Sequence, residues 1–223
     1  MEKIDYSTVI VKKPWGSEYL CYRNGDVAIW LLNIQKGEKT SMHCHPTKNT
    51  GLVVLQGEIE LSFIRNKMLL TGLDKIHIFR ARFHSSAAIS DAFLFEVESP
   101  EDKEDLIRLD DNYGREEQGY EGREFFEEKT EDNFWLKEPR QDDSGQTLFG
   151  CRLRHISVGT VNELELYDEK DVLVFTKGGV ITGDEKKILF PGDIVDGETL
   201  GKIAPRFSVA PKTSIIHLRK NEN

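Results

Sequence analysis

Two histidines separated by one residue, within a run of β-forming residues, constrain this chain more than any other feature. His43 and His45 flank Cys44, Gly37 precedes them, and a short apolar run after them ends at Gly57. Side chains alternate across a β-strand, so both imidazoles are expected on one face and Cys44 on the other. Imidazole is the most common metal ligand, and two rings on one face can bind a single ion. The pattern predicts a metal-binding strand at the mouth of a small β-barrel.

The spacing of these residues resembles the first signature of the cupin superfamily. That signature has a glycine, a His-x-His pair, a glutamate and a second glycine at set intervals, and here Thr50 stands in the glutamate position. A second cupin signature closes on a histidine, and the matching stretch here begins at Leu73-Asp74 and ends at His84. The resemblance implies an all-β, double-stranded β-helix barrel and a metal ion held by His43, His45 and His84.

The three imidazoles favour zinc, iron, nickel or manganese as the divalent metal, since magnesium and calcium prefer oxygen ligands. Thr50 in place of glutamate leaves one more net positive charge, which is expected to lower metal affinity and raise Lewis acidity. The alternative is that the three histidines are structural and hydrogen-bond to the backbone at strand ends. His77, His155 and His217 are expected to be structural.

The composition of the chain excludes some classes of function and indicates the cellular compartment. The chain has 223 residues, 38% hydrophobic and 31% charged, and a net charge of −9, which gives a nucleic-acid role no electrostatic support. No run has the length of a membrane span, and the amino terminus lacks a signal pattern. Three distant cysteines suggest a reducing compartment. We expect a cytoplasmic protein with neither a membrane nor a nucleic acid as partner.

Short apolar runs separated by turn residues predict strands in both halves of the chain. In the first half these runs are 27–32, 52–55, 59–64 and 93–97, and in the second they are 172–175, 179–182, 187–193 and 214–218. Between the halves lies a charged segment that also contains aromatic residues, expected to be a packed connector with a short helix. We therefore predict a metal-binding cupin domain at 1–114, a connector at 115–146 and a degenerate cupin-like domain at 147–223.

The second half repeats the first signature without its histidines. Gly159 and Gly178 keep the outer spacing, whereas Glu165 and Tyr167 occupy the histidine positions and Asp171 the glutamate position. This half is therefore predicted to be a second barrel that has lost its metal. Its expected task is packing against the first half or another subunit, and a homodimer is expected because short barrels alone bury little area.

Two further segments narrow the resemblance to one branch of the cupins. Lys13-Pro14-Trp15-Gly16 and the segment from Leu94 to Arg115 resemble the opening and closing motifs of type II mannose-6-phosphate isomerases and of the isomerase domain of bifunctional isomerase/guanylyltransferases. The resemblance covers about residues 12 to 115. It implies a sugar or sugar phosphate as the small-molecule partner.

Charged residues near the predicted barrel mouth are candidates for chemistry and substrate binding. Glu96 lies in the best-matching segment and is the candidate base, and Arg82, close to His84, is the second catalytic candidate. Cationic and hydroxyl donors suit a phosphorylated sugar, and the candidate substrate-binding residues are Lys39, Lys48, Arg80, Arg108, Tyr113 and Arg115. The alternative is surface charge, with Arg108 pairing Asp110 at a strand end.

The favoured function is a metal-dependent isomerase or epimerase that moves a proton α to the carbonyl of a phosphorylated or nucleotide-linked sugar. A three-histidine non-haem iron dioxygenase is the first alternative, because the missing glutamate opens one face of the metal. A non-catalytic sugar-binding cupin is the second. Fold alone does not separate them, because barrels host many chemistries.

Overall fold

The chain divides into two compact units, Met1–Trp135 and Leu136–Asn223. The computed structural model describes residues 4–141 and 144–221, apart from the side chains of 165 and 166. The predicted connector at 115–146 is shared between the units, since 115–135 belongs to the first and 136–146 to the second. Each unit is described by itself below.

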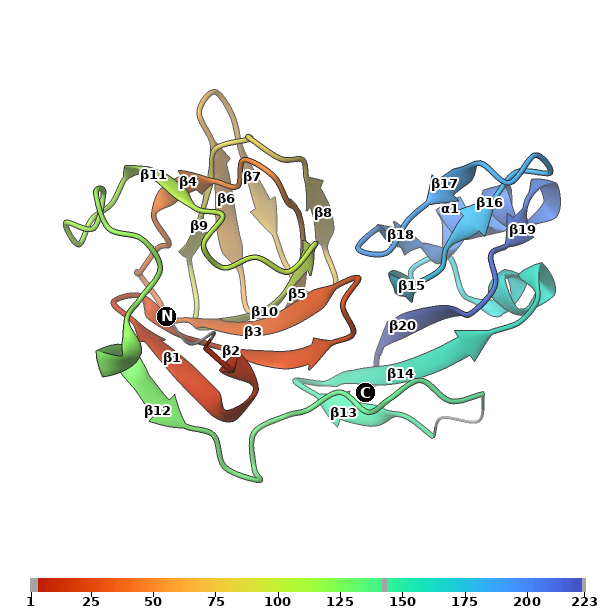
Figure 1. Ribbon diagram of the computed structural model, residues 1–223, viewed down its shortest axis with the longest axis horizontal. Coiled ribbons are helices and arrows are strands. Elements are labelled where there is room, and N and C mark those ends of the chain that lie inside the picture. Colours follow the sequence, from red (N-terminus) through yellow and green to blue (C-terminus); the bar gives the residue numbers. More distant parts are fainter. Residues whose placement is uncertain (1–3, 142–143, 222–223) are drawn as a thin grey trace. The chain divides into compact units, whose positions relative to one another are not determined.

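The first unit consists of short strands with two 3-10 helices (Figure 1). Its elements are η1 (Tyr6–Thr8), β1 (Val9–Lys13), β2 (Gly16–Arg23), β3 (Ala28–Ile34), β4 (Met42–Cys44), β5 (Asn49–Gln56), β6 (Ile59–Phe63), β7 (Lys67–Leu70), β8 (Lys75–Ile78), β9 (His84–Ala88), β10 (Ala92–Ser99), β11 (Ile107–Asp110), η2 (Arg123–Phe125) and β12 (Phe126–Glu128). The strands predicted around residues 27–97 are present as β3, β5, β6 and β10.

These strands form two antiparallel sheets with the order of a jelly roll. One sheet has the order β12-β1-β2-β3-β10-β5-β8 and the other β11-β4-β9-β6-β7. From β3 to β10 the chain passes back and forth between the sheets, and only β6 and β7 are successive strands of the same sheet. The predicted double-stranded β-helix is therefore confirmed for this unit.

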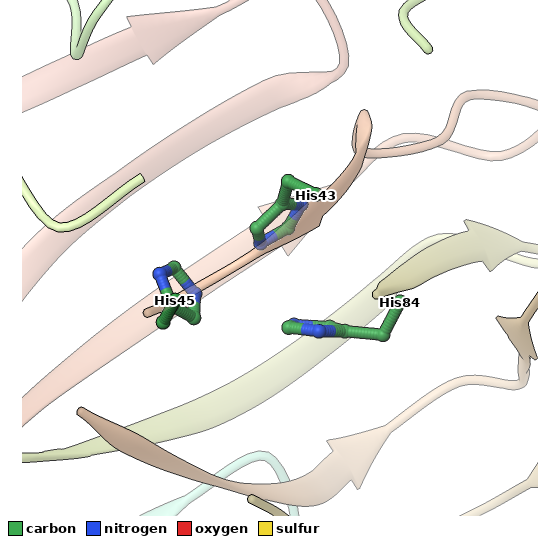
Figure 2. A group of neighbouring side chains, drawn as sticks. All are labelled: His43, His45 and His84. Carbon is green, nitrogen blue, oxygen red and sulfur yellow. The ribbon is translucent and has the colours of Figure 1, made fainter. Parts of the chain in front are cut away.

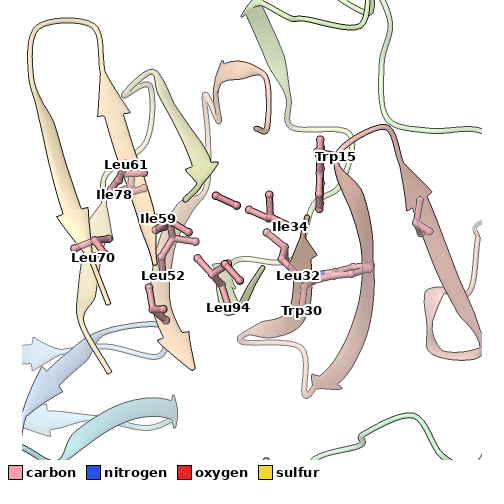
Figure 3. Close-up of a cluster of buried hydrophobic side chains, with 14 of the residues drawn as sticks. Trp15, Trp30, Leu32, Ile34, Leu52, Ile59, Leu61, Leu70, Ile78 and Leu94 are labelled. Atoms are coloured by element: carbon pink, nitrogen blue, oxygen red, sulfur yellow. The ribbon is translucent and has the colours of Figure 1, made fainter. Parts of the chain in front are cut away.

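The core of the first unit lies between the two sheets (Figure 3). Alternate residues of the central strands point inward, so Leu52 of β5 and Leu94 of β10 lie beside Ile59 of β6, and Trp30 of β3 lies farther along the same core. Trp15 and Trp30 are both buried. The same alternation carries Glu96 and Glu98 of β10 to the inner face beyond the apolar Leu94, so the barrel changes from apolar to ionic toward one end.

The segment after β11 closes the first unit. β12 adds to the seven-stranded sheet by pairing with β1, and Tyr120 packs against the apolar core. The short helix predicted in this segment is the 3-10 helix η2. The aromatic residues that distinguished this segment in the sequence thus belong to the first barrel.

The second unit repeats this arrangement on a smaller scale (Figure 1). Its elements are β13 (Gln146–Leu148), β14 (Cys151–Val158), η3 (Val161–Leu166), β15 (Val172–Lys177), β16 (Val180–Ile181), β17 (Lys187–Leu189), β18 (Ile194–Asp196), α1 (Gly197–Ile203), η4 (Ala204–Arg206), β19 (Ser208–Val209) and β20 (Thr213–Lys220). None of the helices in the described parts of the chain is long and apolar enough to cross a membrane.

The strand order shows that the second unit is a degenerate copy. The order β14-β20-β15-β18 corresponds to β3-β10-β5-β8, and β19-β16-β17 corresponds to β9-β6-β7. The position of β4, the strand that carries His43, is taken by the 3-10 helix η3. Tandem barrels with a degenerate second copy are therefore confirmed, and the second copy lacks the strand as well as the histidines.

We predict that Gly57→Ala destabilises the first unit by about 1–3 kcal/mol. Gly57 has φ +87°, and a Cβ there would lie 2.3 Å from the Asp91 carbonyl oxygen, which belongs to backbone that cannot easily move. Gly25→Ala is the matched control, because Gly25 has φ +90° with no atom within 4 Å of its Cβ position. Denaturant unfolding of both variants measures the difference, and equal losses would contradict the steric argument.

Candidate functional site

The fold brings the three predicted metal ligands together at one end of the first barrel. His43 lies on β4 and pairs directly with His84, the first residue of β9, while His45 follows just after β4. One nitrogen of each ring lies within 4.8 Å of the corresponding nitrogens of the other two. Figure 2 shows the rings converging from the two strands. Such a group can hold one metal ion.

Backbone carbonyls orient all three rings. The Nδ1 atom of His43 lies 2.8 Å from the Ser41 carbonyl oxygen, and that of His84 lies 3.0 Å from the Arg82 carbonyl oxygen. For His45 the partner is the Asp105 carbonyl oxygen, at 2.6 Å. A carbonyl only accepts, so each Nδ1 carries the proton and each Nε2 keeps a lone pair. This is the arrangement found around metal-binding histidines.

The cluster is held in the uncharged state that metal binding requires. Burial lowers the pKa of His43 well below its ordinary value, and the neighbouring His84 and His45 lower it further. Burial also lowers the pKa of His45 to about 3 and that of His84 to about 4. At neutral pH all three imidazoles therefore present lone pairs.

A buried nitrogen without a partner provides an independent test of the metal assignment. Nε2 of His45 is buried and makes no hydrogen bond within the described residues. Such a group is costly to leave unpaired, and a metal ion would satisfy it. The donor set therefore fits a transition metal. No carboxylate belongs to the cluster among the residues that the structure describes.

Thr50, which replaces the expected glutamate, is buried on β5 next to a carboxylate from another strand. Its cross-strand partner on β10 is Glu98. Oε1 of Glu98 accepts hydrogen bonds from Lys48 Nζ and is paired with Lys103 Nζ, each at 2.8 Å. Burial raises the pKa of Glu98, but Lys103 and Lys48 outweigh this effect, so the pKa is lowered overall. A charged carboxylate thus stands beside the Thr50 position.

A cavity of about 50 Å³ adjoins the histidines, and charged side chains surround it. His43 and His45 line it together with cationic residues and carboxylates from distant segments. The cations are Lys13, Lys48, Lys103, Arg108 and Arg115, and the carboxylates are Glu18, Glu96, Glu98 and Glu121. Of the predicted substrate-binding residues, Lys48, Arg108 and Arg115 are thus at the cavity.

Most of these charges are paired within the wall of the cavity. Arg115 binds Asp111 and Glu121, and Arg108 donates to the carbonyl oxygens of Gln118 and Gly119 at 2.6 and 2.7 Å. The Nε atom of Arg108 is buried with no hydrogen-bond partner in the described part of the chain. Arg108 therefore keeps one donor for a ligand, whereas Arg115 is held by its two carboxylates.

Glu96 has the electrostatic character of a proton-transfer group. It lies on the inner face of β10 and lines the cavity. Burial raises its pKa, Lys103 opposes the rise, and Glu98 and Glu18 add to it, giving a value of about 7. A carboxyl group with this pKa exchanges protons readily near neutral pH. The structure thus places the predicted base in the same cavity as two of the histidines.

The other predicted residues lie away from the cavity. Arg82 is exposed, with its guanidinium 3.8 Å from the centre of the Phe63 ring, and Arg80 is also exposed. Lys39 Nζ lies 4.0 Å from Asp110 Oδ2, and Arg108 pairs with Glu121 at 3.4 Å instead of with Asp110. Arg82 is therefore not placed to act on a molecule in the cavity.

The hydroxyl of Tyr113 also forms its hydrogen bond outside the cavity. It donates to Glu38 at 2.6 Å, and the Tyr113 ring packs against the apolar core. His77, on β8, lies outside the cluster with its ring 4.9 Å from that of Phe79. Neither side chain lines the cavity.

Several residues that line the cavity were not predicted from the sequence. Lys13 and Glu18 come from the first hairpin, Lys103 from the loop after β10, and Tyr120 and Glu121 from the segment predicted to be a connector. Lys13 pairs with Glu18 at 3.3 Å and with Glu121, and Tyr120 donates to Glu18. Lys13 lies within the opening motif and Lys103 within the segment from Leu94 to Arg115, whereas Tyr120 and Glu121 lie outside both.

The second unit uses its acidic and histidine residues differently. Asp171, in the position of the missing glutamate, accepts hydrogen bonds from Arg219 Nε and Nη2 at 2.8 and 2.6 Å. His155 is buried against Thr176 and the Lys137 carbonyl oxygen, as expected for a structural histidine. Glu165 lies in η3 with its side chain outside the described ones, so a hard-cation site with Asp171 is not assigned.

Comparisons with known proteins found similar solved structures, each with low sequence identity. No family profile and no curated protein sequence matches the chain. Among solved structures, KdgF from Halomonas sp. is 17% identical over 40% of this chain and 84% of its own, with a TM-score of 0.38. An RmlC-like cupin from Shewanella frigidimarina is 18% identical over 44% of this chain and 89% of its own, with a TM-score of 0.40.

A third similar structure is a protein from Acidithiobacillus ferrooxidans that is assigned as a sugar phosphate isomerase. It is 18% identical over 43% of this chain and 67% of its own, with a TM-score of 0.36. The jelly-roll architecture of this chain follows from its own strand order.

We predict that His45→Ala abolishes metal retention while the barrel stays folded. The wild-type chain is expected to hold about one transition-metal ion, bound through three Nε2 atoms. Elemental analysis after dialysis measures the content, and circular dichroism checks the fold. His77→Ala is the matched control and should keep its metal. Full metal content in the His45 variant would rule out the assignment.

We predict that Glu96→Gln gains stability relative to the wild type as pH rises from about 4.5 to about 7. The folded state holds the Glu96 proton more tightly than the unfolded state, so the wild type loses stability across this window. Glutamine has no such dependence, and the difference should reach about 1–3 kcal/mol above pH 7. Urea unfolding at a series of pH values measures it. A difference that does not change with pH would show that Glu96 titrates normally.

Proposed function

We propose that this chain is a metal-dependent isomerase or epimerase that acts on a phosphorylated or nucleotide-linked sugar. The observation that carries the proposal is the placement of Glu96, whose pKa is raised to about 7, in the cavity that His43 and His45 line. An acid–base carboxyl group beside a metal site is the combination that proton transfer α to a carbonyl requires.

The three histidines would hold the metal ion, and Glu96 would transfer the proton. Zinc, iron, nickel or manganese suits the all-imidazole site and, when bound, supplies Lewis acidity toward a carbonyl oxygen. Glu96 in its charged form takes the proton from the hydroxyl-bearing carbon next to the carbonyl, and its protonated form returns that proton to the former carbonyl carbon. The hydroxyl proton of the first carbon passes to the former carbonyl oxygen, which completes the exchange of carbonyl and hydroxyl. A pKa near the working pH allows one side chain to perform both steps.

The wall of the cavity supports an anionic, hydroxyl-rich substrate. Arg108 offers its Nε–H, and Lys103 is fixed between Glu98 and Glu18 at the edge of the same space. A volume of about 50 Å³ has room for only a few heavy atoms. The reacting end of a sugar would therefore enter, and its phosphate would remain toward the mouth. The resemblance of the segment from Leu94 to Arg115 to sugar phosphate isomerases supports the same class.

One observation favours a different chemistry. The cluster consists of three histidines, and no carboxylate in the described residues belongs to it. Three-histidine sites suit non-haem iron enzymes that bind oxygen at an open position. Iron-loaded protein that consumes oxygen only when a substrate is present would favour this alternative over isomerisation.

We predict that Glu96→Gln lowers proton exchange at the substrate by about 100-fold or more, because the glutamine side chain cannot accept a proton. The measurement follows deuterium incorporation next to the carbonyl by NMR, using a panel of aldose and ketose phosphates in deuterated water. In the wild type the rate should rise with pH through about 7, because the charged carboxylate is the base.

The control for this experiment is metal content, which should be unchanged in Glu96→Gln. Loss of exchange with the metal retained separates the role of the carboxyl group from that of the histidines. Exchange at the wild-type rate in Glu96→Gln would refute Glu96 as the base, and no exchange with any sugar phosphate in the wild type would refute the proposed reaction.

A further inference from the structure

The second barrel contains a cavity of its own at the end that corresponds to the metal-bearing end of the first. Its volume is about 340 Å³, and its lining includes Arg152 and Arg154 of β14 and His217 and Arg219 of β20. Tyr167, which follows η3, forms another part of the wall. All of these residues belong to the second unit.

The four basic side chains share one face of adjacent strands. β14 and β20 are antiparallel neighbours, with Arg152 opposite Arg219 and Arg154 opposite His217. On the same face, farther along the strands, Ile156 and Ile215 belong to the barrel core. The basic side chains are therefore on the inner face. Directly opposed like charges are unfavourable in a sheet unless an anion lies between or beside them.

Among the described carboxylates, those that form ion pairs at this cavity pair with Arg219 and not with Arg152. Asp171 and Asp168 pair with Arg219. Glu163 lines the cavity, but its carboxylate accepts hydrogen bonds from the backbone amide and hydroxyl of Thr160. Arg152 donates to the neutral carbonyl of Ser144 at 3.1 Å and forms no ion pair within residues 4–141 and 144–221.

A buried histidine at this cavity has one ring nitrogen without a close partner. His217 is 6% exposed, and its Nδ1 makes no hydrogen bond within the described residues. Its Nε2 lies 2.8 Å from Asp171 Oδ2, so that nitrogen is next to a carboxylate. The Tyr167 ring lies 4.7 Å from the imidazole, centre to centre. A buried polar group in this state calls for a ligand.

The strand pairings of the two barrels show which residues occupy corresponding positions. Leu173 pairs with His217 in the second barrel as Leu52 pairs with Glu96 in the first. Arg219 then corresponds to Glu98. At these two positions the first barrel has carboxylates and the second has basic groups. The corresponding positions of the second barrel are therefore suited to an anionic ligand.

We propose that the second barrel binds a small phosphorylated molecule, with its phosphoryl group held by Arg152, Arg154 and His217. Guanidinium forks match the geometry of phosphate oxygens, and an imidazole N–H adds a further donor. The cavity is larger than a phosphate ion needs and lies within the range of about 300–1,000 Å³ found for ligand pockets. The molecule therefore carries a polar body as well as a phosphoryl group. This inference does not depend on the reaction proposed for the first barrel.

The test titrates the full-length protein with inorganic phosphate, glucose 6-phosphate and glucose by isothermal calorimetry. Both phosphates are expected to bind, with glucose 6-phosphate the tighter, and glucose is not. Arg152→Gln and Arg154→Gln should each weaken binding by about tenfold, the effect of losing one charge-assisted hydrogen bond. In the wild type, phosphate should also shift the imidazole NMR signals of His217, a readout that requires no substitution.

Two control variants locate the bound phosphate. Lys187→Gln removes an exposed positive charge from β17 in the other sheet of the second unit, and Arg65→Gln removes one from the turn between β6 and β7 of the first unit. Both should retain this binding. Arg108→Gln changes the sugar-phosphate site proposed in the first barrel, so it is titrated with inorganic phosphate to test whether the bound phosphate lies there instead. Unchanged affinity in Arg152→Gln and Arg154→Gln, loss of phosphate binding confined to Arg108→Gln, or no binding of either phosphate to the wild type would overturn the proposal.

Discussion

The functional end of the first barrel depends on a buried network of opposite charges. Lys103 lies between Glu98 and Glu18, at 2.8 and 3.5 Å, and Lys48 binds Glu98 from the other side. Removing these ions from water is costly, and their mutual attraction offsets that cost only if each keeps its partners. The network joins β2, β10 and the segments before β5 and after β10. It thereby fixes the backbone from which the histidines and Glu96 project.

The same network sets the electrostatic state of the cavity. Glu18 and Glu98 stay charged because the lysines outweigh their burial. For Glu96 burial outweighs the opposing effect of Lys103, and its pKa is about 7. Neighbouring carboxylates with different partners thus take different roles. The lysines hold two of them as structural anions, and the third remains able to exchange a proton.

Much of this site was accessible from the sequence because the relevant signals are local. Strand alternation placed His43 and His45 on one face, and the spacing of the second signature located His84. Glu18, Lys103 and Glu121 could not be placed in this way, since they reach the cavity through tertiary packing of segments far apart in the chain. Arg82 illustrates the opposite error, because closeness to His84 in sequence did not indicate where its side chain points. The runs of apolar residues predicted the positions of several strands in both barrels, but the replacement of one strand by η3 left no clear sequence signal.

The three histidines are oriented by two kinds of contact, and this difference couples metal binding to the rest of the cavity. His43 and His84 are fixed by carbonyls two residues away, within their own segments. His45 is fixed by Asp105, 60 residues away on the loop that also carries Lys103. Any ligand that displaces this loop must also change the affinity of the histidines for metal, and by thermodynamic reciprocity the metal changes the affinity for that ligand to the same degree. A metal ion held by the three histidines would therefore be linked to whatever binds against the buried ion network.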